Sequence, residues 1–465
     1  MVEIGRFIYR LCGRSGGQGT FVDAIMTVKA HLPHISSRFY LFAFGLALVL
    51  AAYSRFWAAP LSAGADVPQF WAFAKVFQLH GLDFYRYADA SLDIFPTKGW
   101  GFVYPPMWLL ILRLALAAAP MSSATDIMAD SSWRLAMKTP IIAADLAIGC
   151  LLYWAVPGSK LRKLIFASLW LFHPTAWYNS AVFGQFDAIA AALLLASVIM
   201  LERGKDRIAF LIAGLAVLTK QHTFIPIAFM VAISARKMGW RRLISNCAIM
   251  GGVVILFSIP FLLTGNFSAY AHSLFLPGQA PGYQNPLMYA FSGSGALFTY
   301  LHNIFGWETS GYLNFNTPIL LLAILAAFVL CYKRSISAAQ GALIGSLIFI
   351  SLFYRVNYQY LVIYIPVALL VASRTKYISE RIFTIALALL PAAWLWLFNT
   401  SFWFNYVNPK NPWVTPILSR IGLAHTGTPD YAFVSLAMAL MCLSLAYIVL
   451  AFIRWRQPLN NVEPV

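Results

Sequence analysis

The sequence predicts an all-α protein that crosses a membrane many times, with roughly 12 to 13 membrane helices. Hydrophobic residues make up 60% of the chain and charged residues 11%, whereas about a quarter of a soluble domain is charged. Apolar runs near the ~20 residues of a spanning helix recur along the whole chain. Because the bilayer core offers no water to backbone groups, these runs are expected to be helical.

The net charge of +17 follows the same organisation. Lys and Arg residues fall in short clusters between apolar runs, a pattern typical of cytoplasmic loops, so nucleic acid is not an expected partner. Residues 1–38 lack the apolar core and cleavage site of a signal peptide. We therefore expect cytoplasmic tails at 1–38 and 457–465 around one transmembrane domain, 39–456. The five cysteines are scattered, which excludes a disulfide framework or a zinc site by spacing.

The first predicted helix, 39–57, leads to an outer loop at 58–102 that contains Asp66, Asp83, Asp89 and Asp93. An amphipathic helix is expected after Asp66. Later membrane helices are expected at 164–181, 188–201, a short pair on either side of Lys220, 243–263, 316–331, 338–353, 360–372, 382–398 and 431–453. Basic clusters mark the cytoplasmic ends of these helices and leave further outer loops at 264–314 and 399–430.

Two segments depart from simple alternation. The apolar runs 103–119 and 139–156 both lie between the first outer loop and the inner cluster at Lys160, and two full crossings would return the chain to the wrong side. We therefore expect the run 104–119, which starts close to Pro105 and Pro106, to be a re-entrant or interfacial helix.

The helices beside Lys220 are shorter than the ~20 residues of a full span. Their turn is expected to lie below the outer surface and to line a cavity.

Most of the polar residues that could take part in catalysis or ligand binding fall on the predicted outer side. Besides Asp66 they are His173, Asn179, Gln185, Asp187, Lys220, Gln221, His222, His272, Gln279, Arg355, Asn357 and Gln359. An ionisable group within a membrane protein is by default a candidate for function. The sequence contains no phosphate-binding glycine loop, dinucleotide fingerprint or metalloprotease helix.

Each of these signals also has a purely structural interpretation. Asp66 precedes Pro68 and could simply cap a helix that lies on the membrane. Lys220 could extend its charge to the interface, Arg355 could anchor a helix boundary, and the Gly184–Asp187 segment could be a plain turn that starts the next helix. The shared predicted side of these residues, rather than any single one of them, indicates a site.

Several short motifs occur in an order that resembles a known superfamily. They are Gly64-Ala65-Asp66, Val103-Tyr104-Pro105-Pro106-Met107, Gly184-Gln185-Phe186-Asp187, Leu218-Thr219-Lys220-Gln221 and the segment from Arg355 to Tyr360. Together, over residues 40–372, they resemble the GT-C glycosyltransferases, and are similar to the mannosyl- and glucosyltransferases of the asparagine-linked glycosylation and family 87 type. Such enzymes hold a catalytic aspartate in the first outer loop and use lipid-phosphate-linked sugars.

The resemblance implies that a hexose, with mannose or glucose expected first, moves from a polyprenyl-phosphate donor to an acceptor hydroxyl on the outer side, with inversion. Such a transfer needs one base and positive groups that stabilise the departing phosphate. Asp66 is the expected base. The expected phosphate-binding residues are Lys220, His222 and Arg355, and the expected sugar- or acceptor-binding residues are Gln185, Asp187, Gln221, Asn357 and Tyr104.

Two departures from the family pattern limit what the resemblance implies: the first concerns a bound divalent metal, and the second a His or Glu role that is not carried over. Asp66 stands alone where a paired acidic motif is usual, and Asn357 and Gln359 stand where many relatives have His and Glu. No cofactor is certain, although a divalent metal is possible. The acceptor could be a glycan, a glycolipid or a protein, and membrane lipids are expected partners. The membrane would be the cell membrane in a prokaryote and the endoplasmic reticulum in a eukaryote.

A transporter or lipid-linked-sugar flippase is the alternative class of function. It would also place polar groups at mid-depth in the membrane. Its usual mark is an internal repeat with broken helices at corresponding positions of the two halves. The sequence shows no such repeat, and the long first outer loop favours an enzyme.

Overall fold

The computed structural model describes residues 36–62, 64, 66–88, 101–119, 130–264, 267–275, 292–308, 310–333, 336–354, 356–397 and 430–454. All the regular structure in these ranges is helical, which confirms the predicted all-α class. The chain divides into two compact units, Met1–Leu46 and Ala47–Val465. The first contributes the opening turns of one helix, and everything below concerns the second unit.

Five helices in the described ranges are long and apolar enough to cross a membrane. They cover Ser37–Leu61, Ser131–Ala155, Trp240–Leu262, Phe315–Lys333 and Tyr431–Ile453. Shorter apolar helices cover Pro106–Ala118, Ala338–Leu352 and Tyr358–Arg374. The protein is therefore an integral membrane protein with several crossings.

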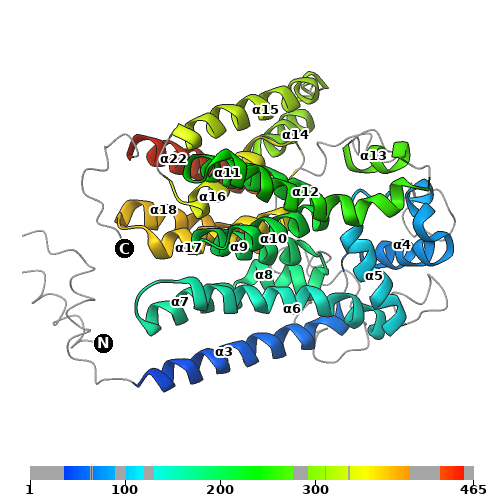
Figure 1. The fold of residues 1–465 in the computed structure, drawn as a ribbon, viewed down its shortest axis with the longest axis horizontal. Helices are drawn as coiled ribbons and strands as arrows, with labels where there is room; N and C mark the ends of the chain where they lie inside the picture. Colours follow the sequence, from blue (N-terminus) through cyan, green and yellow to red (C-terminus); the bar gives the residue numbers. More distant parts are fainter. Residues whose placement is uncertain are drawn as a thin grey trace, which may run out of the picture. The chain divides into compact units, whose positions relative to one another are not determined.

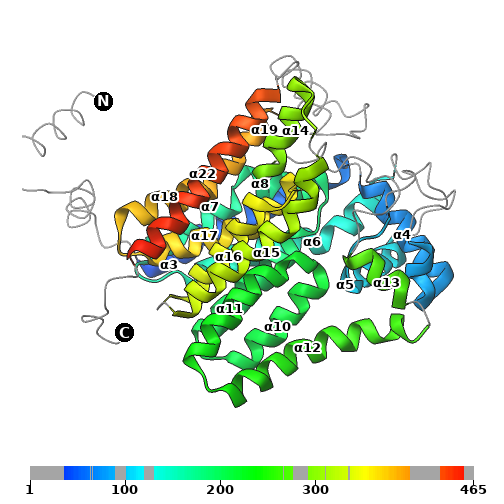
Figure 2. The same ribbon diagram turned by 90° about the horizontal axis from the view of Figure 1, so that it is seen from above.

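The principal helices are α3 (Ser37–Ala58), α4 (Asp66–His80), α5 (Pro106–Ala118), α6 (Ser131–Ala155), α7 (Lys160–Leu171), α8 (Pro174–Trp177), α9 (Asp187–Glu202), α10 (Asp206–Thr219), α11 (Phe224–Lys237), α12 (Trp240–Leu262), α13 (Phe267–Phe275), α14 (Gly293–Phe305), α15 (Ser310–Lys333), α16 (Ala338–Leu352), α17 (Leu361–Arg374), α18 (Ile378–Leu389), α19 (Trp394–Leu397) and α22 (Asp430–Arg454). Figures 1 and 2 show their arrangement, in which α9 packs against α6, α10 and α17.

Two helices predicted as continuous are broken, so these predictions were wrong. The run 164–181 divides into α7, α8 and a π-helix, η4 (Tyr178–Phe183), because Pro174 has no N–H with which to continue the first helix. The run 382–398 ends as α18 at Leu389, and Pro391 lies in the short 3-10 helix η9 (Leu390–Ala393) that follows. Residue 398 itself lies outside the described ranges.

The segments 103–119 and 139–156 also differ in length from their predictions. α6 begins at Ser131, well before residue 139, because the carboxylate of Asp130 accepts the N–H groups of Ser132 and Trp133 at 2.6 and 3.3 Å and caps the helix. α5 has only 13 residues, fewer than the ~20 of a full span. The re-entrant or interfacial placement of α5 stays a prediction.

The ends of helices that carry basic clusters are joined to one another. Arg374 pairs with Glu202, and Arg162 donates to the carbonyl of Ser373. The Arg203 guanidinium lies over the Trp154 ring, 3.2 Å from its centroid. α9 runs from Asp187 to Glu202. Asp187 therefore lies at the end of α9 that is opposite to Glu202 and its basic partner. The membrane side that each end faces stays a prediction.

The predicted outer loops contain helices. α4 forms where a helix was expected, and nine of its residues are buried: Val67, Pro68, Gln69, Phe70, Trp71, Ala72, Phe73, Ala74 and Val76. Eight of them, 67–74, are consecutive and cover the whole circumference of the helix, so α4 is packed into the protein. The loop at 264–314 contains α13 and α14. Residues 399–429 of the loop predicted at 399–430, like most of both tails, lie outside the described residues.

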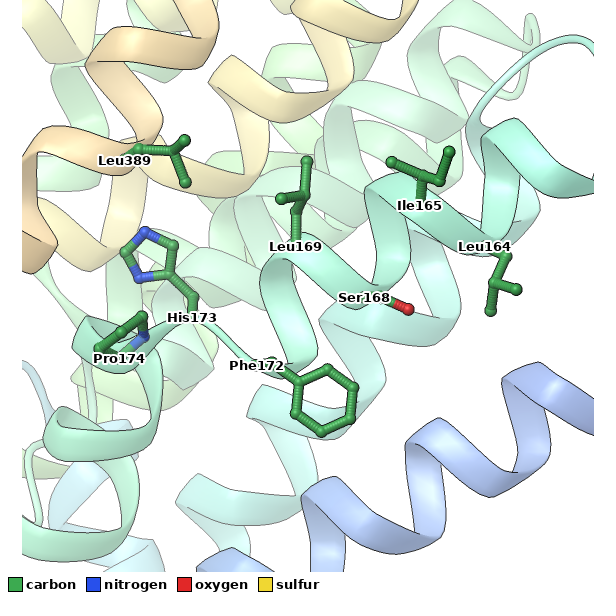
Figure 3. A pocket seen from close by; sticks show the side chains of 8 residues that line it. All are labelled: Leu164, Ile165, Ser168, Leu169, Phe172, His173, Pro174 and Leu389. Carbon is green, nitrogen blue, oxygen red and sulfur yellow. The ribbon is translucent and has the colours of Figure 1, made fainter. Parts of the chain in front are cut away.

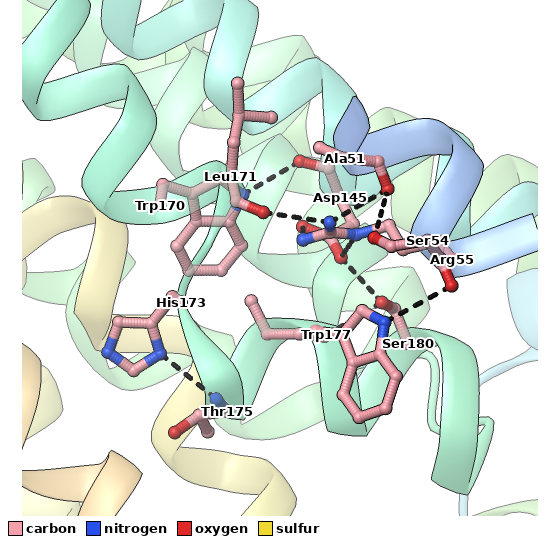
Figure 4. Close-up of polar contacts among 11 residues, drawn as sticks. Ala51, Ser54, Arg55, Asp145, Trp170, Leu171, His173, Thr175, Trp177 and Ser180 are labelled. Carbon is pink, nitrogen blue, oxygen red and sulfur yellow. Dashed lines mark hydrogen bonds and ion pairs between the residues drawn. The ribbon is translucent and has the colours of Figure 1, made fainter. Parts of the chain in front are cut away.

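One buried ion pair and its hydrogen bonds join α3, α6, α7 and the π-helix η4 (Figure 4). Arg55 of α3 approaches Asp145 of α6 with Nε–Oδ2 2.6 Å, and both side chains are at most 1% exposed. Arg55 Nη1 also donates to the carbonyl of Leu171 in α7 at 2.9 Å. The hydroxyl of Ser180 in η4 lies 2.6 Å from Asp145 Oδ2 and donates to it. The network fixes η4 against the three helices.

Replacement of Arg55 by Met should destabilise the protein strongly. The change leaves Asp145 buried without its cation, which typically costs about 3–5 kcal/mol. Arg242→Met is the matched control, since its pair with Asp206 leaves the arginine 63% exposed and exposed pairs contribute about 0–1 kcal/mol. Thermal unfolding in detergent measures both. Equal effects of the two variants would contradict a structural role for the buried pair.

Candidate functional site

The segment that carries Asp66 is docked onto the end of the π-helix. The N–H of Gly64 donates to the carbonyl of Phe183 at 3.0 Å, and the N–H of Val67 donates back to the carbonyl of Gly64 at 3.1 Å. A Cβ atom at position 64 would lie 2.4 Å from the Phe183 ring, so glycine is the residue that fits. This contact sets where α4 begins, and hence where Asp66 lies.

The π-helix ends in a turn that places Gln185 and Asp187. Gly184 has φ 80° and ψ 37°, the left-handed conformation that glycine adopts most readily. The N–H groups of Gly184 and Gln185 both donate to the carbonyl of Asn179, at 3.0 and 2.9 Å. Short π-helical segments often occur at functional sites. Here the turn directs Gln185 toward the Asp66 segment and begins α9 with Asp187.

Gln185 contacts the predicted base directly. Its Nε2 donates a hydrogen bond to Oδ2 of Asp66, across 119 positions of sequence. Gln185 is fully buried. The amide thereby orients the carboxylate.

Lys220 and Asp187 form the charged centre of the site. Lys220 follows α10, and its Nζ lies 2.7 and 2.8 Å from the two carboxylate oxygens of Asp187. Both side chains are at most 1% exposed. Aromatic rings surround the ammonium, with centroids at 4.5 Å for Phe186, 5.0 Å for Tyr360 and 5.4 Å for Tyr104. Such rings attract a cation through their negative faces.

Burial and neighbouring charges determine the ionisation of the two basic residues in this turn. Burial lowers the pKa of Lys220, while the carboxylates of Asp187 and Asp66 oppose that shift. Asp66 therefore lies close enough to act on Lys220. Burial, followed by the charge of Lys220, lowers the pKa of His222 well below its usual range. Burial and this charge therefore both disfavour the imidazolium form of His222, and its imidazole can offer a phosphate one N–H.

The turn after Lys220 is anchored to the Tyr104 segment. Gln221 Nε2 donates to the carbonyl of Val103 at 2.7 Å. The ring of His222 stacks on Phe349 with centroids 5.1 Å apart, and it lies 4.7 Å from the ring of Tyr360. The structure therefore brings Asp66, Tyr104, Gln185, Asp187, Lys220, Gln221 and His222 into one connected set.

Three carboxamides in this region share one bonding pattern. Each NH₂ group donates within the protein: Asn179 to the carbonyl of Gln359, Gln185 to Asp66 and Gln221 to the carbonyl of Val103. Their oxygen atoms, like Oδ1 of Asn357, are buried without a hydrogen-bond partner in the described part of the chain. Buried polar atoms are normally paired. The arrangement therefore offers acceptors for a hydroxyl-bearing ligand or for ordered water.

Other predicted site residues lie elsewhere or cannot be placed. Arg355, Asp89, Asp93 and Gln279 fall outside the described residues. Asn357 directly precedes the short helix η8 (Tyr358–Tyr360), which carries Tyr360 to Lys220. His272 is exposed on α13, and Asp83 lies in the 3-10 helix η2 (Gly81–Tyr87). Neither α13 nor η2 carries a member of the set around Lys220.

His173 has a structural role beside a separate pocket (Figure 3). The pocket has a volume of about 490 Å³ and is lined by Leu164, Ile165, Ser168, Leu169, Phe172, His173, Pro174 and Leu389. Nδ1 of His173 accepts the N–H of Thr175 at 3.2 Å, so Nε2 carries the proton and donates to the carbonyl of Ala388 at 2.9 Å. Burial lowers the pKa of His173 to about 4. The ring is neutral and holds α8 to the end of α18.

Within the described residues, no group of three or more His, Cys, Asp or Glu side chains is positioned to hold a metal ion. Sequence reasoning gave no role to Phe186 or Tyr360, although both lie within the motifs named above. It also missed Lys138, since the apolar run was taken to begin at residue 139. An ionisable residue directly beside an apolar run was the available signal for Lys138.

Comparison with known proteins bears on the segment that contains most of these residues. The model of glycosyltransferase family 87 matches residues 102–313. Among curated proteins, none matches the chain. Among solved structures, the crystal structure of ArnT from Cupriavidus metallidurans bound to undecaprenyl phosphate is similar over 90% of this chain and 77% of that one, with a TM-score of 0.44 and 15% identity. Residues 102–313 of this membrane protein thus match glycosyltransferase family 87, which confirms the resemblance that the sequence motifs predict.

Proposed function

We propose that this protein moves a hexose, mannose or glucose, from a polyprenyl-phosphate donor to an acceptor hydroxyl on the outer side of the membrane, with inversion. The observation that carries the proposal is the convergence of Asp66 and Lys220. Gln185 binds the Asp66 carboxylate, and two residues further on Asp187 pairs with the buried Lys220 ammonium, so a single turn connects the two groups although they come from distant helices. The family 87 match over residues 102–313 supports sugar transfer as the reaction class.

The chemistry assigns one step to each group. Asp66 accepts the proton of the acceptor hydroxyl while the hydroxyl oxygen forms a bond to the anomeric carbon. The bond from that carbon to the phosphate oxygen breaks, and its electron pair leaves with the polyprenyl phosphate. Because the phosphate leaves without a proton, no general acid is needed, unlike the arrangement of two carboxylates in glycosidases. Attack from the face opposite the phosphate inverts the anomeric centre.

Lys220 is assigned to the phosphate, with His222 and Arg355 as further contacts. A cation near the leaving group stabilises the charge that develops as the bond breaks. Asp187 already partners Lys220, so the bound phosphate would share the ammonium with this carboxylate. His222 would contribute a neutral N–H. The assignment of Arg355 rests on its sequence position two residues before Asn357.

The sugar is assigned to the carboxamide oxygens. Gln185, Gln221 and Asn357 each present a buried oxygen without a protein partner among the described residues, and sugar hydroxyls are donors that would satisfy them. Tyr104 lies beside Lys220 and is assigned to the sugar or the acceptor. A glycan, a glycolipid or a protein could supply the accepting hydroxyl.

Transfer in the presence of a chelator tests whether a divalent metal is required.

Asp66→Asn should abolish transfer while stability stays nearly unchanged. Asn caps a helix about as well as Asp, whereas loss of a general base typically lowers the rate by ~10²- to 10⁴-fold. The assay measures the transfer of labelled hexose to a membrane lipid extract by purified protein. Polyprenyl-phosphate mannose and polyprenyl-phosphate glucose are tested separately as donors. Thermal unfolding is measured on the same preparation.

Asp83→Asn is the matched control for that experiment, because Asp83 belongs to the same predicted outer loop but lies in η2 rather than at the start of α4. Near-normal transfer by Asp66→Asn would show that Asp66 is a cap rather than the base. Movement of intact donor across vesicles, with no sugar transferred by the unmodified protein, would support the flippase alternative instead.

A pair of variants separates phosphate binding by Lys220 from simple pairing with Asp187. Lys220→Met alone leaves a buried carboxylate unpaired and should destabilise by about 3–5 kcal/mol. The double variant Lys220→Met/Asp187→Asn removes both charges, so stability should largely return. If Lys220 binds the phosphate, donor affinity stays reduced in the double variant. Recovery of normal donor affinity would show that the lysine only balances Asp187.

A further inference from the structure

Lys138 is a buried cation that the proposed reaction does not use. It lies on α6 with no exposed surface. Its Nζ lies within hydrogen-bond distance of four backbone carbonyls, at 3.1 Å for Ala59, 2.5 Å for Ser62, 2.8 Å for Ala181 and 2.9 Å for Val182. The hydroxyl of Ser62 lies 3.3 Å away. No ion pair recorded among the described residues joins Lys138 to a carboxylate.

A buried ammonium without a carboxylate partner is costly, because it leaves water and gains only neutral acceptors. An apolar side chain at this position would fill the space at lower cost. The carbonyls that contact Lys138 explain how the charge is tolerated. Ala59 and Ser62 lie at the end of α3 and its short extension η1 (Ala59–Leu61), and Ala181 and Val182 lie at the end of η4. Carbonyls at helix C-termini carry partial negative charge and favour a cation.

The two chain segments joined by Lys138 are those that carry Asp66 and Gln185. Ser62 shortly precedes Asp66, and Val182 shortly precedes Gln185. The same two segments are joined by the N–H of Gly64, which donates to the carbonyl of Phe183, and by Gln185, which donates to Asp66. The Lys138 side chain also occupies the space next to Gly184, where a Cβ atom would lie 2.9 Å from its Cε.

We propose that Lys138 is a positioning residue that holds the Asp66 carboxylate and the Gln185 amide in register by binding the carbonyl ends of both segments. This inference rests on the proposed role of Asp66 as the base. No hydrogen bond recorded among the described residues joins Lys138 to either group, and it acts through the backbone carbonyls of Ala59, Ser62, Ala181 and Val182. Displacement of a catalytic group by about 1 Å can lower a rate by ~10²-fold, so a lysine distant from the reacting atoms can govern turnover.

The test compares Lys138→Met with Lys75→Met, a lysine on α4 outside this junction. Hydrogen exchange monitored by mass spectrometry is the readout that does not require activity. Lys138→Met should speed exchange in both 59–68 and 179–187, with little change in α16 and α17. Turnover of the polyprenyl-phosphate hexose donor should fall by about 10- to 100-fold, with a nearly unchanged KM for the donor. Lys75→Met should leave exchange in both segments and turnover unchanged.

Unchanged exchange in the two segments, or equally faster exchange throughout the protein, would overturn the proposal. Retained turnover by Asp66→Asn would instead refute the proposed base, and the exchange result would still decide whether Lys138 joins the segments. If Lys138→Met does not fold, Lys138→Arg decides, because it keeps the charge with a different reach. Faster exchange in both segments together with lower turnover is then expected, and lower turnover with unchanged exchange in both segments would overturn the proposal.

Discussion

The ion pair between Lys220 and Asp187 is the interaction on which the geometry of the candidate site depends. Both charges are buried, and neither could remain ionised there without the other. The pair requires the end of α10 to meet the start of α9, and it brings the rings of Phe186, Tyr104 and Tyr360 around the ammonium. A phosphate that reaches Lys220 would enter an arrangement that is already charged, desolvated and fixed in place.

The buried ionic groups on the neighbouring helices position the other half of the site. Arg55 and Asp145 fix the π-helix η4 against α3, α6 and α7, and Lys138 binds the carbonyls at the end of that helix. The turn at Gly184 then carries Gln185 to Asp66. Each of these polar groups is expensive inside an apolar protein. Their common result is a defined position for one carboxylate beside one cation.

Much of the fold could be predicted from the sequence, because hydrophobic run length decides where membrane helices form. The short pair beside Lys220 was found in this way, whereas the helix that starts at Asp66 was predicted from its apolar spacing and its capping residues. The break at Pro391 was missed because its flanking residues are apolar. The break at Pro174 was missed because apolar residues resume on both sides of His173-Pro174-Thr175, so a hydropathy average continues across it. The early start of α6 was missed because Arg134 and Lys138 are charged. Both Lys220 and Asp187 were predicted as site residues, but Lys220 was expected to bind the phosphate and Asp187 the sugar or acceptor. Their pairing was missed because it depends on tertiary contacts that no local sequence pattern contains.

An enzyme and a transporter would both require buried polar groups, but an enzyme also requires its base to face the bound donor. An experimental structure with a polyprenyl-phosphate hexose bound measures this directly. The account predicts the phosphate beside Lys220 and the sugar between the carboxamide oxygens and Asp66. An acceptor hydroxyl at the anomeric carbon would then lie within the ~2.6–3.2 Å reach of the carboxylate, or one water away. A donor bound elsewhere, for example in the pocket between Leu164 and Pro174, with Asp66 and Lys220 both without contact to it, would contradict the account.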